Sequence, residues 1–424
     1  MMTAMGPGEL LSAAADVVRE DPDKRLAIYV HVPFCLSKCH FCDWVVDIPV
    51  RRLRYDEEER RDYLDALRTQ IRLYGPLLTG LGYRPEVMYW GGGTPTRLTP
   101  RELTHLAETV RESFDLSTLR QWSVETTPND LTEDRVAALR EAGVDRMSIG
   151  VQSLSEYQLR VSGRAHGPDD VTRAVELLRA GGIDNFNVDL ISGFPGETLD
   201  ALGETFDRLL ALDPPHVSVY PYRATPKTVM AMQLTRRQIE AHDRTAMTRA
   251  YELSMERLRA AGYHEYCHGY WVRDPAHEDQ DGNYKYDLTG DKIGFGSGAE
   301  SIIGHHLLWN ENRKYDEYLG HPDRFTFAHR FSLDEPSRLT ATVGGALMTR
   351  EGVVFERFRR LTGLSFHDVR DTPYFRRWLT VLTDCGARFA ETPTALRMES
   401  DTIHRAYITH LAYTMYSGLT PERA

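Results

Sequence analysis

Short runs of β-branched and aromatic residues alternate along the first half of the chain with segments of helical periodicity. Each run is short enough for one buried strand, and each following segment repeats apolar residues every three or four positions. The pattern predicts six strands, at Leu26–Val32, Glu86–Trp90, Trp122–Thr126, Arg146–Val151, Asn185–Ile191 and His216–Tyr220. It predicts helices between them at Tyr55–Tyr74, Pro100–Phe114, Thr132–Ala142, Pro168–Ala180 and Leu199–Leu212. This alternation favours an α/β fold in which a parallel sheet curls into a barrel-like form with its helices outside.

The alternation ends near residue 273, and the rest of the chain has a looser pattern. A long helix is predicted at Arg236–Ala261, followed by a polar stretch, a Gly-rich segment (IGFGSGAESIIG) and a helical, mostly polar tail from about Ser332. We therefore divide the chain into an N-terminal extension (1–25), a barrel (26–273) and a smaller, mostly helical domain (274–424) that covers the substrate. A length of 424 residues fits a barrel with one appendage.

Composition and charge exclude several classes of protein. Hydrophobic residues make up 41% and charged residues 27% of the chain, which is ordinary globular usage and not that of a disordered, collagenous or coiled-coil protein. A net charge of -11 offers no basic surface for a phosphate backbone, so we expect no nucleic-acid partner. No apolar stretch approaches the ~20 residues that span a bilayer, and the amino end lacks a signal-peptide pattern. We expect no membrane association and a cytoplasmic location.

Three of the five cysteines, Cys35, Cys39 and Cys42, lie close together directly after the first predicted strand. Three thiolates on one short loop can each hold one iron of a [4Fe-4S] cluster, whereas a closed cluster takes four cysteines. The fourth iron would then stay open to another ligand. The alternative is a structural zinc site, but no fourth ligand follows at the usual spacing, and His40 lies where the loop would have to buckle.

A second motif, YWGGGTPT, begins at Tyr89, follows a predicted strand and precedes a predicted helix. Three successive glycines would let backbone N–H groups come close to a charged group of a ligand, at the carboxyl edge of the sheet where barrel sites assemble. A tight turn explains the same residues equally well. The motif by itself leaves both interpretations open.

Six segments together resemble the radical S-adenosylmethionine (SAM) enzymes of the oxygen-independent coproporphyrinogen III dehydrogenase type. They occur in order between about Ala27 and Gly304: YVHVPFCLSKCHFCDW, YWGGGTPT, SVETTP, SIGVQSL, FNVDLISGFPGET and IGFGSGAES. The resemblance implies a partial (β/α)6 TIM-like barrel with a smaller, mostly helical C-terminal domain. It also implies a [4Fe-4S] cluster, two molecules of SAM, and a reductant such as flavodoxin or ferredoxin.

The resemblance assigns roles to individual residues of this sequence. Cys35, Cys39 and Cys42 would hold the cluster, and Phe41 would pack beside the adenine of SAM. Residues that match contacts to a first SAM are Tyr29, Gly92 and Glu125, and those that match contacts to a second are Gly93, Thr94, Gln152, Arg164 and Asp189. These residue types suit SAM, because an arginine fork pairs with a carboxylate and acids accept hydrogen bonds from ribose hydroxyls or the ammonium group.

The chain departs from the porphyrin-oxidising members at several points. It has Trp44 where they carry a further cysteine, its N-terminal arm is shorter, and Arg223 falls where they have a small residue beside the second SAM. Arg223 would grip a carboxylate or a peptide carbonyl, unless it points to solvent. With the CDWVV continuation, these departures favour the class C radical SAM methyltransferase branch. The alternatives are a heme chaperone and a coproporphyrinogen III dehydrogenase.

The expected reaction of that branch uses two SAM molecules. A 5′-deoxyadenosyl radical from the first would abstract hydrogen from the methyl group of the second, and the product radical would add to an sp2 carbon. The substrate would be a small aromatic or heteroaromatic natural product, or a peptide-derived one, which is methylated or cyclopropanated. Glu125, Asp189 and Glu300 would offset the sulfonium charges, and Glu300 would act as the base. The alternative for Glu300 is an acid favoured at a helix start.

Overall fold

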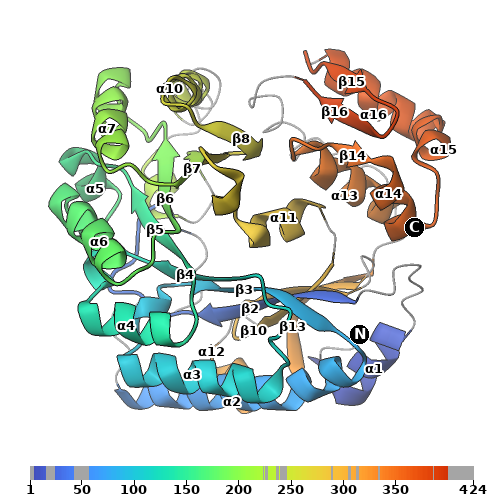
Figure 1. The fold of residues 1–424 in the computed structure, drawn as a ribbon, viewed down its shortest axis with the longest axis horizontal. Helices are drawn as coiled ribbons and strands as arrows, with labels where there is room; N and C mark the ends of the chain where they lie inside the picture. Colours follow the sequence, from blue (N-terminus) through green and yellow to red (C-terminus); the bar gives the residue numbers. More distant parts are fainter. Residues whose placement is uncertain are drawn as a thin grey trace.

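The computed structural model describes most of the chain, and Figure 1 shows a barrel-like sheet with helices outside it and a C-terminal unit beside it. The described residues are 4–15, 24–42, 57–222, 224, 228–234, 238, 246–287, 290–303, 307–311, 315–332, 335–384 and 386–399. No helix among these residues is both long enough and apolar enough to cross a lipid bilayer.

The six predicted strands are confirmed, and each pairs in parallel with the next. They are β2 (Arg25–Val32), β3 (Arg84–Gly92), β4 (Gln121–Thr126), β5 (Arg146–Gln152), β6 (Phe186–Ser192) and β7 (His216–Pro221). The helices between them are α2 (Glu57–Gly80), α3 (Pro100–Ser113), α4 (Glu133–Glu141), α5 (Glu156–Val161), α6 (Pro168–Ala180) and α7 (Leu199–Ala211). Because all six strands run parallel, their carboxyl ends lie at one edge of the sheet.

Helix α3 illustrates how local sequence sets these bounds. The Thr99 hydroxyl accepts from the backbone N–H of Glu102, and the Glu102 carboxylate accepts from the N–H of Thr99 at 2.7 Å. This capping box precedes Pro100, whose fixed φ suits a first helical turn. The apolar face of the helix is fully buried at Leu103 and Val110, so the cap and the hydrophobic contact act together.

The sheet continues past residue 273, where we expected the barrel to end. Strand β10 (Asp291–Phe295) pairs in parallel with β2, and β11 (Glu300–Ile303), β12 (Leu307–Glu311) and β13 (Phe325–Ser332) follow antiparallel. Near the amino end, β1 (Ala4–Met5) pairs with β13 and precedes α1 (Pro7–Ala15). At the other edge, β9 (Tyr270–Val272) pairs antiparallel with β7 and with β8 (His264–Cys267). Further helices are α8 (Val229–Met232), α10 (Met247–Ala260), α11 (Gln280–Asp287) and α12 (Tyr315–Gly320).

The C-terminal unit is mostly helical and has a hydrophobic core of its own, centred on Val343, Leu347 and Trp378. Its elements are α13 (Glu335–Leu347), β14 (Val353–Val354), α14 (Phe355–Thr362), α15 (Phe366–Arg370), α16 (Pro373–Asp384), β15 (Phe389–Glu391) and β16 (Ala395–Met398). It contacts the barrel edge through backbone hydrogen bonds, from His268 N to Met348 O (2.9 Å) and from Arg350 N to Tyr266 O (2.8 Å). The unit is therefore attached along β8.

Residues 278–287 close the amino end of the barrel. The Gln121 side chain, at the start of β4, donates to Glu278 O at 3.0 Å and accepts from Gln280 N at 2.8 Å. The Tyr284 hydroxyl donates to the carboxylate of Glu86 at 2.7 Å, near the start of β3. Helix α11 consequently lies across the barrel, as Figure 1 shows, and the carboxyl ends of the strands are the side on which a ligand site can form.

Candidate cofactor site

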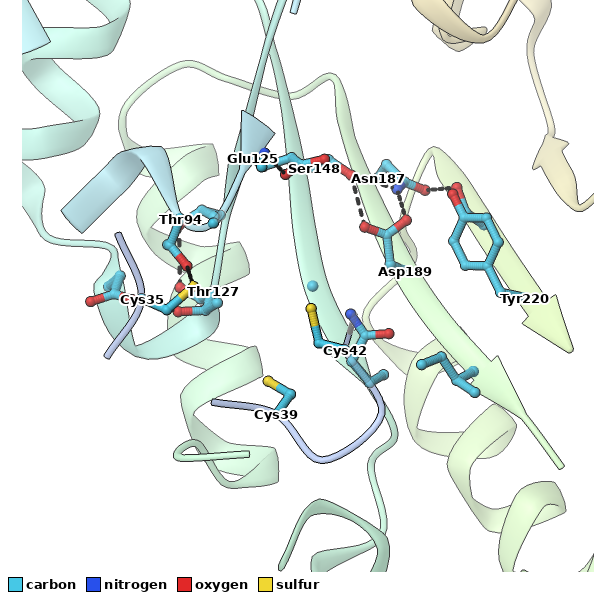
Figure 2. Close-up of a pocket in the computed structure, with 18 of the residues that line it drawn as sticks. Cys35, Cys39, Cys42, Thr94, Glu125, Thr127, Ser148, Asn187, Asp189 and Tyr220 are labelled. Carbon is cyan, nitrogen blue, oxygen red and sulfur yellow. Dashed lines mark hydrogen bonds between the residues drawn. The ribbon is translucent and has the colours of Figure 1, made fainter. Parts of the chain in front are cut away.

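One cavity of about 540 Å³ extends from the carboxyl ends of the strands into the barrel and brings together residues that are far apart in the sequence. Every described residue that was assigned to a cofactor or to catalysis lines it: Tyr29, Cys35, Cys39, Phe41, Cys42, Gly92, Gly93, Thr94, Glu125, Gln152, Arg164, Asp189 and Glu300. Arg223 lies outside the described residues. Figure 2 shows the cysteine loop on one side of this space and the strand residues on the other.

The cysteine loop is held in place by His40. Its backbone N–H donates to Ser162 O, its ring Nδ1–H donates to Val161 O, and its carbonyl accepts from Met230 N, at 2.8, 2.8 and 2.9 Å. The ring therefore points to the end of α5 and anchors the loop there. Among the described residues, no three His, Cys, Asp or Glu side chains lie close enough together to hold one metal ion.

The three thiols fit a [4Fe-4S] cluster by their chemistry. Burial, together with the neighbouring thiols of Cys39 and Cys42, raises the pKa of the Cys35 thiol to about 12. Thiolates that repel one another in a buried place are stabilised when a cationic metal centre neutralises them. Two cavity residues also contact these sulfurs: Thr94 Oγ1 lies 3.9 Å from Cys35 Sγ, and Arg164 Nη1 lies 3.2 Å from Cys39 Sγ.

The glycine motif borders the cavity, but for a different reason from the one expected. The N–H groups of Gly92, Gly93 and Thr94 donate within the protein, to Glu125 Oε2 (3.0 Å), Val32 O (2.9 Å) and Phe34 O (2.7 Å). A Cβ atom on Gly92, whose φ is +104°, would lie 2.4 Å from the His31 ring, and one on Gly93 would lie 2.6 Å from Pro33. Glycine is needed at these two positions because the end of β3 packs tightly on the end of β2 and on Pro33 after it, and the N–H groups of Gly92 and Gly93 are already used within the protein.

Two carboxylates face the cavity from β4 and β6. Glu125 accepts from the Tyr89 hydroxyl at 2.8 Å as well as from Gly92 N, and burial raises its pKa to about 7, with Asp189 adding to the shift. Asp189 accepts from Ser148 Oγ at 3.0 Å and from Asn187 Nδ2 at 2.7 Å. Burial raises the pKa of Asp189 as well, against the effect of these hydrogen bonds. Such carboxylates suit a ligand with cationic or hydroxyl groups.

Gln152 and Arg164 lie where β5 approaches the cysteine loop. Gln152 has a φ of +72°, an unusual conformation for a residue other than glycine, next to a register shift between β5 and β6. The guanidinium of Arg164 donates to Gly150 O and contacts Cys39 Sγ. Arg164 was expected to pair with a SAM carboxylate, and here it bridges the strand end and the cysteine loop.

Glu300 is exposed at the first position of β11, on the lining of the cavity. The alternative that we considered for it, an acid at the start of a helix, is therefore wrong. The Gly-rich segment forms a turn between β10 and β11, in which Gly296 and Gly298 have φ values of +100° and +83°. This turn reverses the chain tightly and places Glu300 on the cavity lining, to which Lys292 of β10 also belongs.

Several polar cavity residues were missed by the sequence analysis: Tyr89, Ser148, Asn187, Ser218, Tyr220, Tyr270, Asp279, Asp281 and Lys292. A signal existed for some of them, because alternate residues of a strand share one face. Asn187 precedes Asp189 by two positions on β6, and Ser148 is two positions from Gly150 on β5. Polar residues at every second position of an otherwise apolar strand indicate an inner face that meets a ligand or a polar network.

Comparison with known proteins agrees with this geometry. The profile of the Radical SAM superfamily matches residues 29–209. The heme chaperone HemW of Bacillus subtilis is 32% identical over 279 residues, which cover 65% of this chain and 70% of that protein. The oxygen-independent coproporphyrinogen III oxidase of Paracoccus denitrificans is 35% identical over 242 residues, which cover 57% of this chain and 52% of that protein. The structure of the coproporphyrinogen III oxidase HemN from Escherichia coli matches 98% of this chain and 95% of that one, with 22% identity and a TM-score of 0.78.

The chain belongs to the radical SAM superfamily and, within it, to the family of heme chaperones and oxygen-independent coproporphyrinogen III oxidases. Membership implies a [4Fe-4S] cluster and SAM. The likeness to the HemN structure shows a shared fold.

The expected methyltransferase function is wrong. The relatives are heme chaperones and coproporphyrinogen oxidases, which overturns both the class C branch and a role in modifying an aromatic natural product. Glu300 was expected to act as the base in that reaction, so this role is not retained. Trp44 and Arg223, two of the residues on which the prediction depended, lie outside the described residues.

Proposed function

We propose that this protein is a heme-binding radical SAM protein of the chaperone type. Cys35, Cys39 and Cys42 hold a [4Fe-4S] cluster, SAM binds in the cavity beside them, and heme binds at the cavity mouth. The observation that carries the proposal is that the cysteine loop and the strand-end residues from β2 to β6 line one cavity. Residues so distant in sequence converge on the place where a barrel of this class binds its cofactors.

The residues of the cavity support distinct tasks. When bound, a cluster with three cysteine ligands supplies the electron that cleaves SAM reductively. Glu125 and Asp189 offer carboxylates to the ammonium, sulfonium or ribose hydroxyls of SAM, and Phe41 offers a ring face to its adenine. Arg164 holds the cysteine loop against the end of β5, so the thiols and the carboxylates keep a fixed distance from each other.

The heme assignment rests on the relatives and on the character of the cavity mouth. Proteins named heme chaperone HemW match at 32% and 33% identity over 70% of their own length, whereas the coproporphyrinogen III oxidase of Paracoccus denitrificans matches at 35% identity over 52% of its length. Leu36 and Tyr220, at 37% and 39% exposure, are among the most exposed large apolar side chains that the structure describes, and both line the cavity. With Ile191 they offer an apolar, partly aromatic surface to the face of a planar macrocycle.

The test uses the full chain, reconstituted anaerobically with iron and sulfide. We expect four iron atoms per chain, SAM binding in equilibrium dialysis, and a Soret band when heme is added to an equimolar protein solution. Because residues assigned to a first and to a second SAM line the same cavity, the proposal includes two SAM molecules per chain, and the dialysis stoichiometry checks that number. Leu36→Asp with Tyr220→Ser should weaken heme binding and leave SAM binding unchanged.

The outcomes separate the proposal from its competitor. Conversion of coproporphyrinogen III with release of carbon dioxide, without a stable heme complex, would replace the chaperone function with a dehydrogenase. Heme binding that survives in Leu36→Asp/Tyr220→Ser would contradict the proposed place of heme. Reconstituted protein that holds no iron would overturn the cofactor assignment itself.

A further inference from the structure

A series of hydrogen bonds runs along the inner face of the barrel and ends at Asp189. At its far end, Tyr266 OH accepts from Asp279 N and meets His216 Nε2, both at 2.8 Å. His216 Nδ1 lies 2.6 Å from Asn187 Oδ1, and Asn187 Nδ2 lies 2.7 Å from Asp189 Oδ1. His216 is completely buried, so these hydrogen bonds are shielded from water.

The direction of each hydrogen bond follows from the chemistry of the groups. Asn187 Oδ1 can only accept, and it also accepts from Ser218 Oγ at 3.0 Å, so the proton of the His216 ring is on Nδ1. The other nitrogen, Nε2, then accepts from Tyr266 OH. Burial and the charge of Arg146 lower the pKa of His216 well below its usual value, which keeps the ring neutral. Every donor in this series of hydrogen bonds therefore points toward Asp189.

Ser148 completes the arrangement on the neighbouring strand. Its hydroxyl accepts from Asn187 Nδ2 at 2.8 Å and donates to Asp189 Oδ2 at 3.0 Å. Each oxygen of Asp189 thus receives a hydrogen bond from a buried donor behind it, as Figure 2 shows for Ser148 and Asn187. Ser218 also hydrogen-bonds to Asp189. Because the two carboxylate oxygens together have four lone pairs, at least one stays available for a ligand in the cavity.

We propose that His216 and Tyr266 are positioning residues, which hold the Asn187 amide so that Asp189 is fixed as an acceptor for the hydroxyl or ammonium groups of bound SAM. This inference rests on the proposed function in taking SAM as the ligand. Tyr266 also receives the N–H of Asp279, in the segment that closes the amino end of the barrel. The closing segment and the cofactor site are consequently joined by one network.

The test compares SAM dissociation constants, measured by equilibrium dialysis on the cluster-loaded chain. His216→Phe removes the donor to Asn187 and should weaken SAM binding about tenfold, the effect of one buried hydrogen bond in a charged network. His216→Asn restores an N–H near the position of Nδ1 and should return the affinity to within about threefold of the wild type. Wild-type affinity in His216→Phe, or equal weakening in His216→Asn, would overturn the proposal.

A milder pair of variants covers the case in which His216→Phe does not fold. Tyr266→Phe and Tyr263→Phe each remove one buried hydroxyl at or next to β8. The Tyr263 hydroxyl donates to Pro214 O and takes no part in the hydrogen bonds that lead to Asp189, so Tyr263→Phe is the control. Both should lower the melting temperature, and Tyr266→Phe alone should weaken SAM binding, by about threefold. Equal affinities in the two variants would contradict the inference. A wild-type chain that holds its cluster and binds no SAM would instead overturn the proposed function, and this inference with it.

Discussion

The two walls of the cavity differ in how they are held. The loop wall, residues 33–42, carries the three thiols and is fixed by a few contacts, chiefly those of His40 and Arg164. The sheet wall, the inner faces of β2 to β7, carries Glu125 and Asp189 inside hydrogen-bond networks that cross from strand to strand. A change in the loop wall should therefore affect what is bound and spare the fold, whereas a change in the sheet wall should affect both.

The largest effect is expected from the loop wall. Cys39→Ala removes one cluster ligand, and since two thiolates rarely retain a [4Fe-4S] cluster, nearly all cluster iron should be lost. The Cys39 side chain is only half-buried, so the melting temperature of the apo form should stay close to that of the wild-type apo form. Iron analysis and absorbance near 420 nm measure the first effect, and calorimetry measures the second.

Cys267→Ala is the matched control, because Cys267 is buried on β8 and does not line the cavity. It should keep its iron and lose stability, by about 1 kcal/mol for a small buried side chain. Iron loss in Cys267→Ala similar to that in Cys39→Ala would mean that the two walls cannot be separated in this way.

The next largest effect is expected where the two walls meet, at Gly92. Gly92→Ala places a methyl group 2.4 Å from His31 at a φ of +104°, so both strain and a steric clash oppose it. We expect a loss of about 2–4 kcal/mol in the free energy of unfolding. Urea denaturation of the apo chain measures it.

Gly196→Ala separates these two contributions. Gly196 also has a positive φ, +80°, but a Cβ atom there would meet nothing within 4 Å. Its replacement should cost about 1 kcal/mol from backbone strain alone. If the two variants lose the same stability, the contact between β3 and the His31 ring is not what requires glycine at position 92.

The contrast between the loop wall and the sheet wall also explains how much could be predicted from the sequence. The six parallel strands and the cysteine loop were predicted because their signals are local: apolar runs with helices between them, and three ligands within a few residues. Strand β10 was missed because it is short and adjoins glycines, and its pairing with β2 depends on contacts between residues that are 265 positions apart. Alternating polar residues such as Asn187 and Asp189 carried a usable signal that pointed to the inner face.

Two interpretations failed for physical reasons. The glycine motif was placed correctly at the cavity, but the use of its N–H groups by Glu125 and by the Val32 carbonyl depends on tertiary packing, which no local pattern contains. The methyltransferase branch was inferred from a few substitutions around the cysteine loop. A single side chain such as Trp44 says little about the substrate, because specificity depends on the whole cavity and its cover.

Glu125 offers a smaller test of the sheet wall, through pH. Its pKa, raised to about 7 by burial, means that the carboxylate ionises as the pH rises through neutrality. A cation binds better to the ionised form, so the affinity for SAM should increase by about tenfold between pH 6 and pH 8, with proton release on binding. Glu125→Gln should bind more weakly and lose this slope. An unchanged slope in that variant would assign the titration to another group, such as Asp189.

The smallest expected effect concerns the anchor of the loop wall. His40→Ala removes the hydrogen bond from the ring to Val161 O but keeps the backbone hydrogen bonds of residue 40, so the loop should loosen by about 1 kcal/mol. Gly163, where a Cβ atom would lie 2.9 Å from the ring, shows how closely His40 packs there. Iron transfer to a chelator at equilibrium should rise about fivefold, with the melting temperature of the apo chain unchanged.

Two further variants serve as controls. His40→Asn should restore the retention of iron, and His105→Ala, on the exposed face of α3, should not alter it. A lower melting temperature without iron loss would place His40 among the supports of the fold and remove it from those of the cluster.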